Sequence, residues 1–71
     1  MNKFSLTIKN LRAEKNLSLE KVAKKLGISR QAVNLWEHGR TLPRIGKITQ
    51  LAKIYESNAQ LLFESLFENK I

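Results

Sequence analysis

The sequence has no cysteine and no aspartate, and only one histidine, one proline and three glycines among its 71 residues. The absence of cysteine excludes disulfides and thiolate metal sites and fits a reducing compartment. One histidine with scattered glutamates lacks the paired ligand spacing of a metal site, and no nucleophile stands at an interpretable spacing from a base. Three isolated glycines do not form a phosphate-binding loop. We therefore expect no enzymatic activity, no metal and no cofactor.

Long apolar runs are also missing. No stretch approaches the roughly 20 apolar residues that a membrane-spanning helix needs, and the N-terminus lacks the apolar core of a secretory signal. Aromatic residues make up 7% of the chain and are not interleaved with basic ones, which argues against single-stranded nucleic acid as a ligand. These absences predict a soluble cytoplasmic protein with no membrane association.

What remains is a short, basic chain. Residues 1–71 are expected to form one domain, and a chain of this length buries only about 60% of its extended-chain surface, so oligomerisation would help to stabilise it. The net charge is +7, and residues 1–44 hold ten Lys and Arg against three Glu, whereas residues 45–71 hold three of each. Such a basic region is typical of polyphosphate binding, although a merely solvated lysine-rich surface has the same composition.

Two short segments with helical periodicity lie in this basic region, at about residues 18–38. Ser18 is placed to cap the first helix, and Gly27 follows its last apolar residue, where a left-handed conformation ends a helix at little steric cost. Ser29 supplies a second cap and Gly39 a second terminator. The apolar residues at helical spacing are Leu19, Val22, Ala23 and Leu26, followed by Ala32, Val33 and Trp36. This pattern predicts a helix-turn-helix.

The second helix of this unit has a polar outer side. Opposite its apolar residues stand Arg30, Gln31, Asn34 and Leu35. A guanidinium, two amides and an aliphatic group are the groups that read guanine, adenine and the thymine methyl in a major groove. We therefore predict that these four side chains contact DNA bases.

At these residues the sequence resembles the lambda-repressor-like, Cro-type helix-turn-helix family, also called XRE, over roughly residues 7–63. The matching residues are Leu11-Arg12, Leu17-Ser18, Val22-Ala23, Leu26-Gly27-Ile28-Ser29, Val33, Trp36-Glu37, Gly39, Pro43 and Leu51-Ala52. The resemblance implies an all-α, compact five-helix domain. It also implies a sequence-specific transcriptional regulator, a repressor that binds double-stranded DNA as a homodimer at a palindromic operator. Such a protein would be bacterial or encoded by a phage or plasmid, and associated with the nucleoid.

The resemblance assigns further roles. Arg12 and Glu37 stand where the family pairs an arginine with a glutamate late in the recognition helix, which implies a partly buried, bidentate ion pair; two solvated charges are the alternative. In the family, the turn after the recognition helix grips DNA phosphates. The candidate phosphate contacts are Ser18, Lys21, His38, Arg40, Thr41 and Arg44.

Some positions depart from the family pattern. Arg44 stands where a small capping residue is usual, and Glu56-Ser57 stand where glycine and an aliphatic residue are usual. Leu19 replaces a glutamine that braces the recognition helix, and Leu35 replaces a polar residue that reads bases. We expect these changes to alter the start of the fourth helix, the connection after it, and the number of specific hydrogen bonds.

Three more helices are expected around this unit. Ser5 would cap a first helix that carries Leu6, Ile8, Leu11 and Ala13 and ends near Lys15-Asn16, with residues 1–4 as a short arm. A fourth helix has an apolar stripe at Ile45, Ile48, Leu51, Ala52 and Tyr55. Asn58 would cap a fifth helix, at about residues 58–68, that carries Ala59, Leu62, Phe63, Leu66 and Phe67.

The fifth helix has a wider apolar stripe than one monomer covers, which predicts a homodimer. The expected dimer interface consists of Phe63, Leu66, Phe67 and Ile71. The alternative is that these residues only complete the core of the monomer.

A second hypothesis for function is a protein-binding module of the same fold, such as an antitoxin, that holds its partner through the fifth helix. RNA or membrane association through Lys21, Lys24 and Lys25 is a further alternative, although most such clusters are solvated helix faces.

Overall fold

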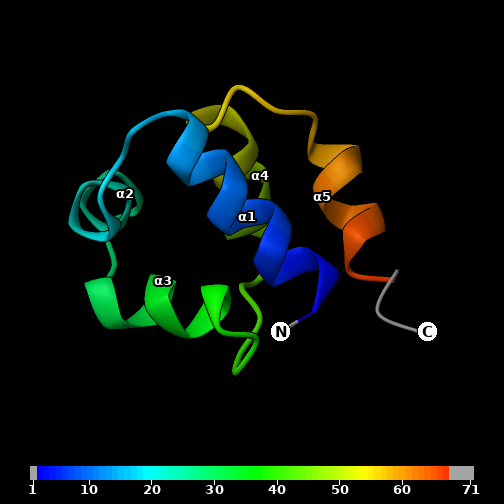
Figure 1. Ribbon diagram of the computed structural model, residues 1–71, viewed down its shortest axis with the longest axis horizontal. Coiled ribbons are helices and arrows are strands. Elements are labelled where there is room, and N and C mark those ends of the chain that lie inside the picture. The colour runs from blue at the N-terminus through cyan, green and yellow to red at the C-terminus, as the bar shows by residue number, and fades with distance from the viewer. Residues whose placement is uncertain (1, 68–71) are drawn as a thin grey trace.

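Five helices make up the fold in residues 2–67, which are the residues that the computed structural model describes (Figure 1). They are α1 (Lys3–Glu14), α2 (Leu19–Leu26), α3 (Arg30–Glu37), α4 (Ile45–Ile54) and α5 (Ala59–Ser65). No strand occurs within that range, so the predicted all-α, five-helix class is confirmed. None of these helices has the length and apolar character that crossing a membrane would require.

Helices α2 and α3 form the predicted helix-turn-helix. The Ser18 hydroxyl accepts a hydrogen bond from the Lys21 amide at 3.0 Å, and the Ser29 hydroxyl accepts from the Ala32 amide at 3.2 Å. Each helix therefore begins at a side-chain cap. Gly27 ends α2 with a φ of 70°, and the next amide, of Ile28, donates to the Ala23 carbonyl at 3.0 Å. This hydrogen-bonded left-handed turn redirects the chain sharply into α3.

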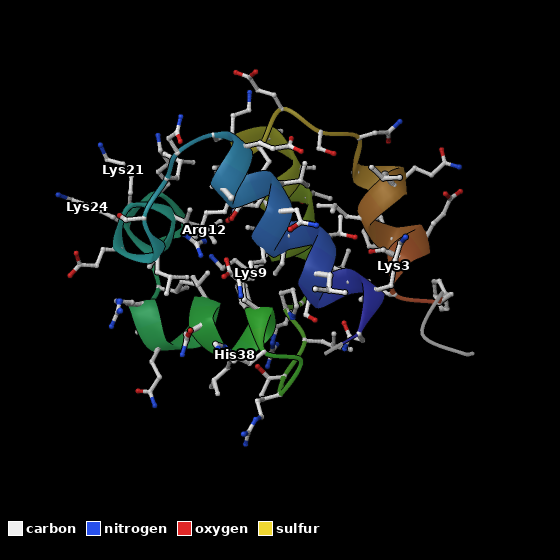
Figure 2. All side chains as sticks on the ribbon, in the orientation of Figure 1. Lys3, Lys9, Arg12, Lys21, Lys24 and His38 are labelled. Carbon is white, nitrogen blue, oxygen red and sulfur yellow. The ribbon has the colours of Figure 1, made fainter. Side chains whose placement is uncertain are left out.

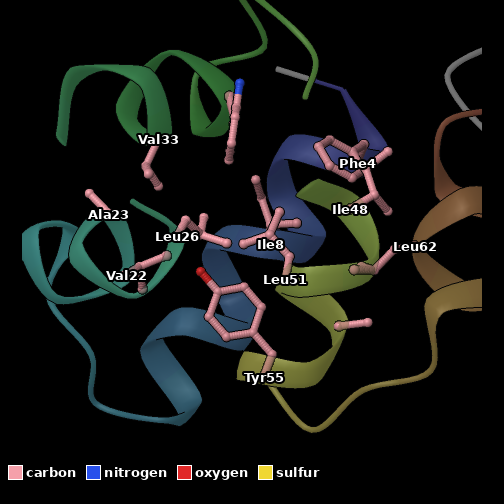
Figure 3. Packing of buried hydrophobic residues seen from close by; sticks show 12 residues of the cluster. Phe4, Ile8, Val22, Ala23, Leu26, Val33, Ile48, Leu51, Tyr55 and Leu62 are labelled. Carbon is pink, nitrogen blue, oxygen red and sulfur yellow. The ribbon is translucent and has the colours of Figure 1, made fainter. Parts of the chain in front are cut away.

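The core lies where α1, α4 and the helix-turn-helix meet, and α5 covers one side of it (Figure 3). Ala23 and Val33 are buried where α2 and α3 pack together, as expected of small side chains that let two helices approach closely. Leu19 packs against the core, so its apolar side chain has a structural role at the position where the family carries a bracing glutamine. The buried apolar residues are Phe4, Ile8, Val22, Ala23, Leu26, Val33, Trp36, Ile48, Leu51, Ala52, Tyr55 and Leu62.

The start of α1 differs from the prediction. We expected an arm over residues 1–4 and a cap at Ser5, whereas α1 begins at Lys3 with Asn2 as its cap. The Asn2 side chain accepts from the Ser5 amide at 2.8 Å, and the Ser5 hydroxyl accepts from the Asn2 amide at 3.0 Å. This reciprocal capping box satisfies two backbone donors, where a single cap satisfies one. The earlier start buries Phe4 completely and leaves Leu6 44% exposed.

The start of α4 also departs from the predicted apolar stripe. Arg44 is the N-cap residue, but its side chain makes no capping hydrogen bond. Ile45, which the stripe placed in the core, is 70% exposed. The first turn of α4 extends past the core, and burial begins one turn later, at Ile48. The departure noted at Arg44 therefore leaves α4 without the side-chain cap that α2 and α3 have.

The last helix is shorter than expected. Asn58 caps α5 as predicted, accepting from the Gln60 amide at 2.8 Å, but the helix ends at Ser65 and not near residue 68. The buried Ser65 hydroxyl donates to the Leu62 carbonyl at 2.6 Å. A serine that bonds the backbone in this way competes with the helical hydrogen bonds of the next turn.

The connections before α2 and after α4 each contain a non-glycine residue with positive φ. Asn16 has a φ of 56°, and Glu56 has a φ of 52° where the family usually has glycine. The Lys15 ammonium lies 2.6 Å from a Glu56 carboxylate oxygen, so the two connections are tied together at the surface. This hydrogen bond and the charge of Lys15 lower the pKa of the Glu56 carboxyl.

Candidate nucleic-acid interface

Helix α3 has one buried side and one open side. Val33, Trp36 and Glu37 are buried. Of the four predicted base-reading residues, Arg30 and Gln31 are exposed, and Asn34 and Leu35 are half-buried. Helix α3 has eight residues, and an α-helix with its side chains is about 10–12 Å in diameter, which fits the roughly 12 Å width of a B-DNA major groove. Because α3 lies along the lower boundary of the molecule in Figure 1, with no other helix beyond it, a duplex can approach this side.

A bidentate ion pair holds α3 against α1. Arg12 Nε donates to Glu37 Oε2 at 2.7 Å, and Arg12 Nη2 donates to Glu37 Oε1 at 3.0 Å. Arg12 Nη1 also donates to the Leu17 carbonyl at 2.8 Å. The Glu37 side chain is only 3% exposed, and its hydrogen bond raises the pKa of the Arg12 guanidinium. The pair that the resemblance implied is therefore present, and it fixes the last turn of α3 to both α1 and the connection before α2.

Tyr55 lies beside this ion pair. Its hydroxyl is buried and has no hydrogen-bond partner among residues 2–67. Burial raises the pKa of the Tyr55 phenol, and the negative charge of Glu37 acts in the same direction. Tyr55 therefore stays neutral next to the Arg12–Glu37 pair, and it contributes packing to the core where a second charge would disturb the pair.

The segment after α3 presents the predicted loop donors. Gly39 has a φ of 71°, and the Arg40 amide donates to the Leu35 carbonyl at 3.0 Å, so α3 ends in the same kind of turn as α2. The buried Pro43 anchors the segment against the protein. The candidate phosphate contacts in this segment, His38, Arg40, Thr41 and Arg44, are all exposed.

His38 is oriented by the helix that it follows. Its Nδ1 lies 2.8 Å from the Asn34 carbonyl oxygen. Because a carbonyl can only accept, Nδ1 donates, and Nε2 is the ring nitrogen left to meet a ligand. Figure 2 shows His38 at the lower boundary of the molecule, where α3 ends.

The remaining two candidates, Ser18 and Lys21, lie at the start of α2 and not on the segment after α3. Ser18 and Lys21 are exposed at the start of α2, and Figure 2 shows Lys21 pointing outward from α2, well separated from His38. The structure thus does not gather the six candidate phosphate contacts in one cluster. It divides them between α2, which leads into α3, and the segment that follows α3.

Two exposed apolar side chains stand among the loop donors. Leu42 is 57% exposed, and Ile45 is 70% exposed. Leu42 has no predicted role, and the predicted apolar stripe of the fourth helix places Ile45 in the core. The available signal was their position on either side of Pro43-Arg44, where Leu42 belongs to no helix and Ile45 lies in the first turn of α4.

Of the predicted dimer residues that the structure describes, only Phe67 is exposed. Phe63 and Leu66 are half-buried and pack against the core. Phe67 is 79% exposed, and Leu61, which the prediction omitted, is 50% exposed. Ile71 lies outside the described residues.

Comparison with known proteins gives a consistent result. A family model described as helix-turn-helix matches residues 8–62. The cryptic phage CTXphi transcriptional repressor RstR of Vibrio cholerae is 35% identical over 52 residues, which covers 73% of this chain and 47% of that protein. The chain thus spans about half the length of this curated relative. The range matched by the family model includes α2, α3 and the segment after α3, where the candidate contacts lie.

Proposed function

The chain belongs to the Cro-type helix-turn-helix family of DNA-binding transcriptional regulators, and on this basis we propose that it binds double-stranded DNA sequence-specifically through α3 and represses transcription. The observation that carries the proposal is the two-sidedness of α3. Its buried side is fixed by the core and the Arg12–Glu37 pair, so its other side is held rigidly at the surface. A rigidly held row of donors and acceptors is what base recognition in the major groove requires.

Within this proposal, base recognition is divided among four side chains. Arg30 and Gln31 are exposed at the start of α3, where a recognition helix meets base edges. Asn34, one turn later, adds an amide suited to adenine, and Leu35 adds an apolar contact to a thymine methyl. Leu42 and Ile45 are exposed beside the loop donors, and they offer further apolar contacts to the sugars or methyl groups of the same duplex.

Phosphate contacts hold α3 in register in this proposal. Ser18 and Lys21 bind one strand near the start of α3, and His38, Arg40, Thr41 and Arg44 bind the other near its end. The separation of Lys21 on α2 from His38 at the end of α3 supports this division (Figure 2). Because such contacts release counterions, affinity should fall steeply with salt.

The proposed assembly is a homodimer on a palindromic operator. A second copy would cover the apolar surface of Phe63, Leu66 and Phe67, and would place two α3 helices in successive major grooves about 34–36 Å apart. The 79% exposure of Phe67 supports an interface here. The same exposed surface keeps open a second candidate function, in which this face holds a different protein, as an antitoxin does.

We place the protein in the cytoplasm with the nucleoid, with residues 1–71 as one domain.

The experiment that tests the proposal is selection of bound duplexes from a random pool, repeated at two salt concentrations. The expected result is a two-fold symmetric consensus that survives the higher salt, with half-sites about one helical turn apart. A single unsymmetric half-site would remove the homodimer from the proposal. Binding without any consensus, lost equally for all duplexes at higher salt, would reduce the protein to a non-specific polycation and favour the protein-binding alternative.

A further inference from the structure

A concavity of about 420 Å³ lies between the C-terminal end of α2 and the C-terminal half of α4. It is lined by Lys24, Lys25, Leu26 and Gly27 from the first of these elements and by Gln50, Lys53 and Ile54 from the second. We call it the α2–α4 groove. None of its residues is a predicted DNA contact, and none lies on α3 or on the segment after it.

The rim of the α2–α4 groove is positively charged without compensation. Lys24, Lys25 and Lys53 are exposed, and within residues 2–67 none of the three takes part in an ion pair. The C-terminal end of α2 carries a partial negative charge. Its last carbonyl, that of Leu26, accepts a hydrogen bond from Lys47 Nζ at 2.9 Å. An anionic ligand would therefore meet three ammonium groups without ion-pair partners in the described part of the chain, beside an α2 terminal carbonyl that already accepts a hydrogen bond.

The floor of the groove is apolar and open. Leu26 and Ile54 line it, and both belong to the core or pack against it. At Gly27 no atom lies within 4 Å of the place where a side chain would begin, so the space above the turn is empty. A phosphodiester backbone presents charge but no side chain to fill such a space, whereas an acidic peptide with aliphatic residues presents both.

From this combination of an unpaired cationic rim and an open apolar floor, we propose that the α2–α4 groove binds an acidic, amphipathic peptide segment of a partner protein. One aliphatic side chain of the segment fills the space over Gly27 and Ile54, and its flanking carboxylates pair with Lys24, Lys25 and Lys53. The proposal does not depend on the DNA-binding proposal. Since the two surfaces share no residue, a partner held here can remain bound while α3 contacts DNA.

The test is a titration of the isotope-labelled full chain with a short helical peptide that carries Leu at positions i and i+4 flanked by Glu, followed by amide NMR shifts. The expected shifts are confined to residues 24–27 and 50–54. Lys53→Glu and, independently, Lys24→Glu should each weaken peptide binding about five- to tenfold, because an attraction becomes a repulsion. Lys9→Glu is the matched control, since Lys9 is also an exposed helix lysine but lies outside the groove; it should leave binding within about twofold.

Several outcomes would overturn the proposal. Equal binding of a peptide with Ser in place of both Leu residues would show that the groove attracts charge alone. A short duplex that shifts the same amides and displaces the peptide would make the groove part of the DNA surface. Anionic lipid vesicles that bind with the same dependence on Lys24 and Lys53 would replace a protein partner with a membrane. Absence of any shift at residues 24–27 and 50–54, with all variants folded, would leave the groove without this function.

Discussion

The α2–α3 pair and the α4–α5 pair are both made of two short helices, but they are stabilised in different ways. Both helices of the first pair begin at serine caps, and each is followed by a glycine in the left-handed conformation. In the second pair α4 has no side-chain cap, and Glu56 occupies a left-handed position without being glycine. The second pair therefore depends more on its packing against α1 and the core.

This difference matches the proposed functions of the two helix pairs. The α2–α3 pair must hold a recognition side in a fixed orientation, and its local signals, its buried ion pair and its core contacts all favour the same conformation. In the α4–α5 pair, the residues that break local rules are exposed, as Arg44, Ile45 and Phe67 are. Exposed residues that lower the stability of the fold are expected where a surface contacts DNA or a partner protein.

The largest predicted effect is on the Arg12–Glu37 pair. Arg12→Ala should lower the free energy of unfolding by about 3 kcal/mol, because the almost fully buried Glu37 carboxylate loses its partner. Lys15→Ala is the matched control, since it removes the exposed Lys15–Glu56 pair and should cost less than about 1 kcal/mol. Urea unfolding of both variants measures the difference. Equal costs for the two variants would mean that the buried pair does not distinguish α3 from the rest of the chain.

A second prediction separates stability from binding at Arg44. Arg44→Ser should stabilise the protein by about 1 kcal/mol by giving α4 the cap that it lacks, and it should reduce the salt slope of DNA binding by about one through loss of a phosphate contact. Lys9→Ser also removes one positive charge, but outside the proposed contacts, and it should leave both quantities nearly unchanged. Thermal unfolding and salt-dependent affinity provide the two measurements. If the slope is unaltered in Arg44→Ser, Arg44 does not contact phosphate.

A third prediction compares the two kinds of left-handed position. Glu56→Gly should raise the free energy of unfolding by about 0.5–1 kcal/mol, because glycine adopts positive φ without a steric cost. The control is Glu56→Gln, which removes the charge of the exposed Lys15–Glu56 pair and keeps a side chain at this position. Glu56→Gly should have a higher free energy of unfolding than Glu56→Gln. Gly27→Ala should act in the opposite direction, at a cost of about 1 kcal/mol, although there is open space for the methyl group. A destabilised Glu56→Gly variant would show that the Lys15 contact outweighs the backbone conformation.

The smallest effect at neutral pH is predicted for Tyr55. Tyr55→Phe removes a buried hydroxyl that has no partner in the described chain, so it should change the free energy of unfolding by less than about 1 kcal/mol at pH 7. The raised pKa of the phenol implies stability that is present below the ordinary tyrosine pKa of 10.0 and is lost as the pH rises above it, because the unfolded chain ionises first. Unfolding experiments above pH 10 should therefore show a steeper loss for the wild type than for Tyr55→Phe. Parallel curves would place the phenol in a more solvated environment.

The parts of the fold that the sequence predicted well are those with local signals. Ser18, Gly27 and Ser29 act within one turn of their own positions, and the periodicity between them was sufficient to place α2 and α3. The Arg12–Glu37 pair joins residues far apart in the chain, and it was found through the family resemblance alone. Its geometry could not be derived from spacing.

The errors arose where two local solutions compete. Both Asn2 and Ser5 can cap a helix, and the structure uses them together, so α1 starts earlier than a cap at Ser5 alone would indicate. Ile45 fits the helical spacing of the apolar residues in α4. That spacing gives no information on where the core ends, and the first turn of α4, with Ile45, extends past it. For the site, residue types predicted which side chains are suited to DNA. The separation of the phosphate candidates into one group on α2 and one on the segment after α3 depends on tertiary structure.

The central claim is that the open side of α3 reads bases, and the most direct test is the affinity of Gln31→Ala for the selected duplex and for a scrambled duplex of equal length. Gln31 is exposed and makes no contribution to the core, so the variant should fold like the wild type. We expect a loss of about 1–3 kcal/mol on the selected duplex, relaxed preference at one base pair, and little change on the scrambled one. An equal loss on both duplexes, or no loss on either, would contradict the claim.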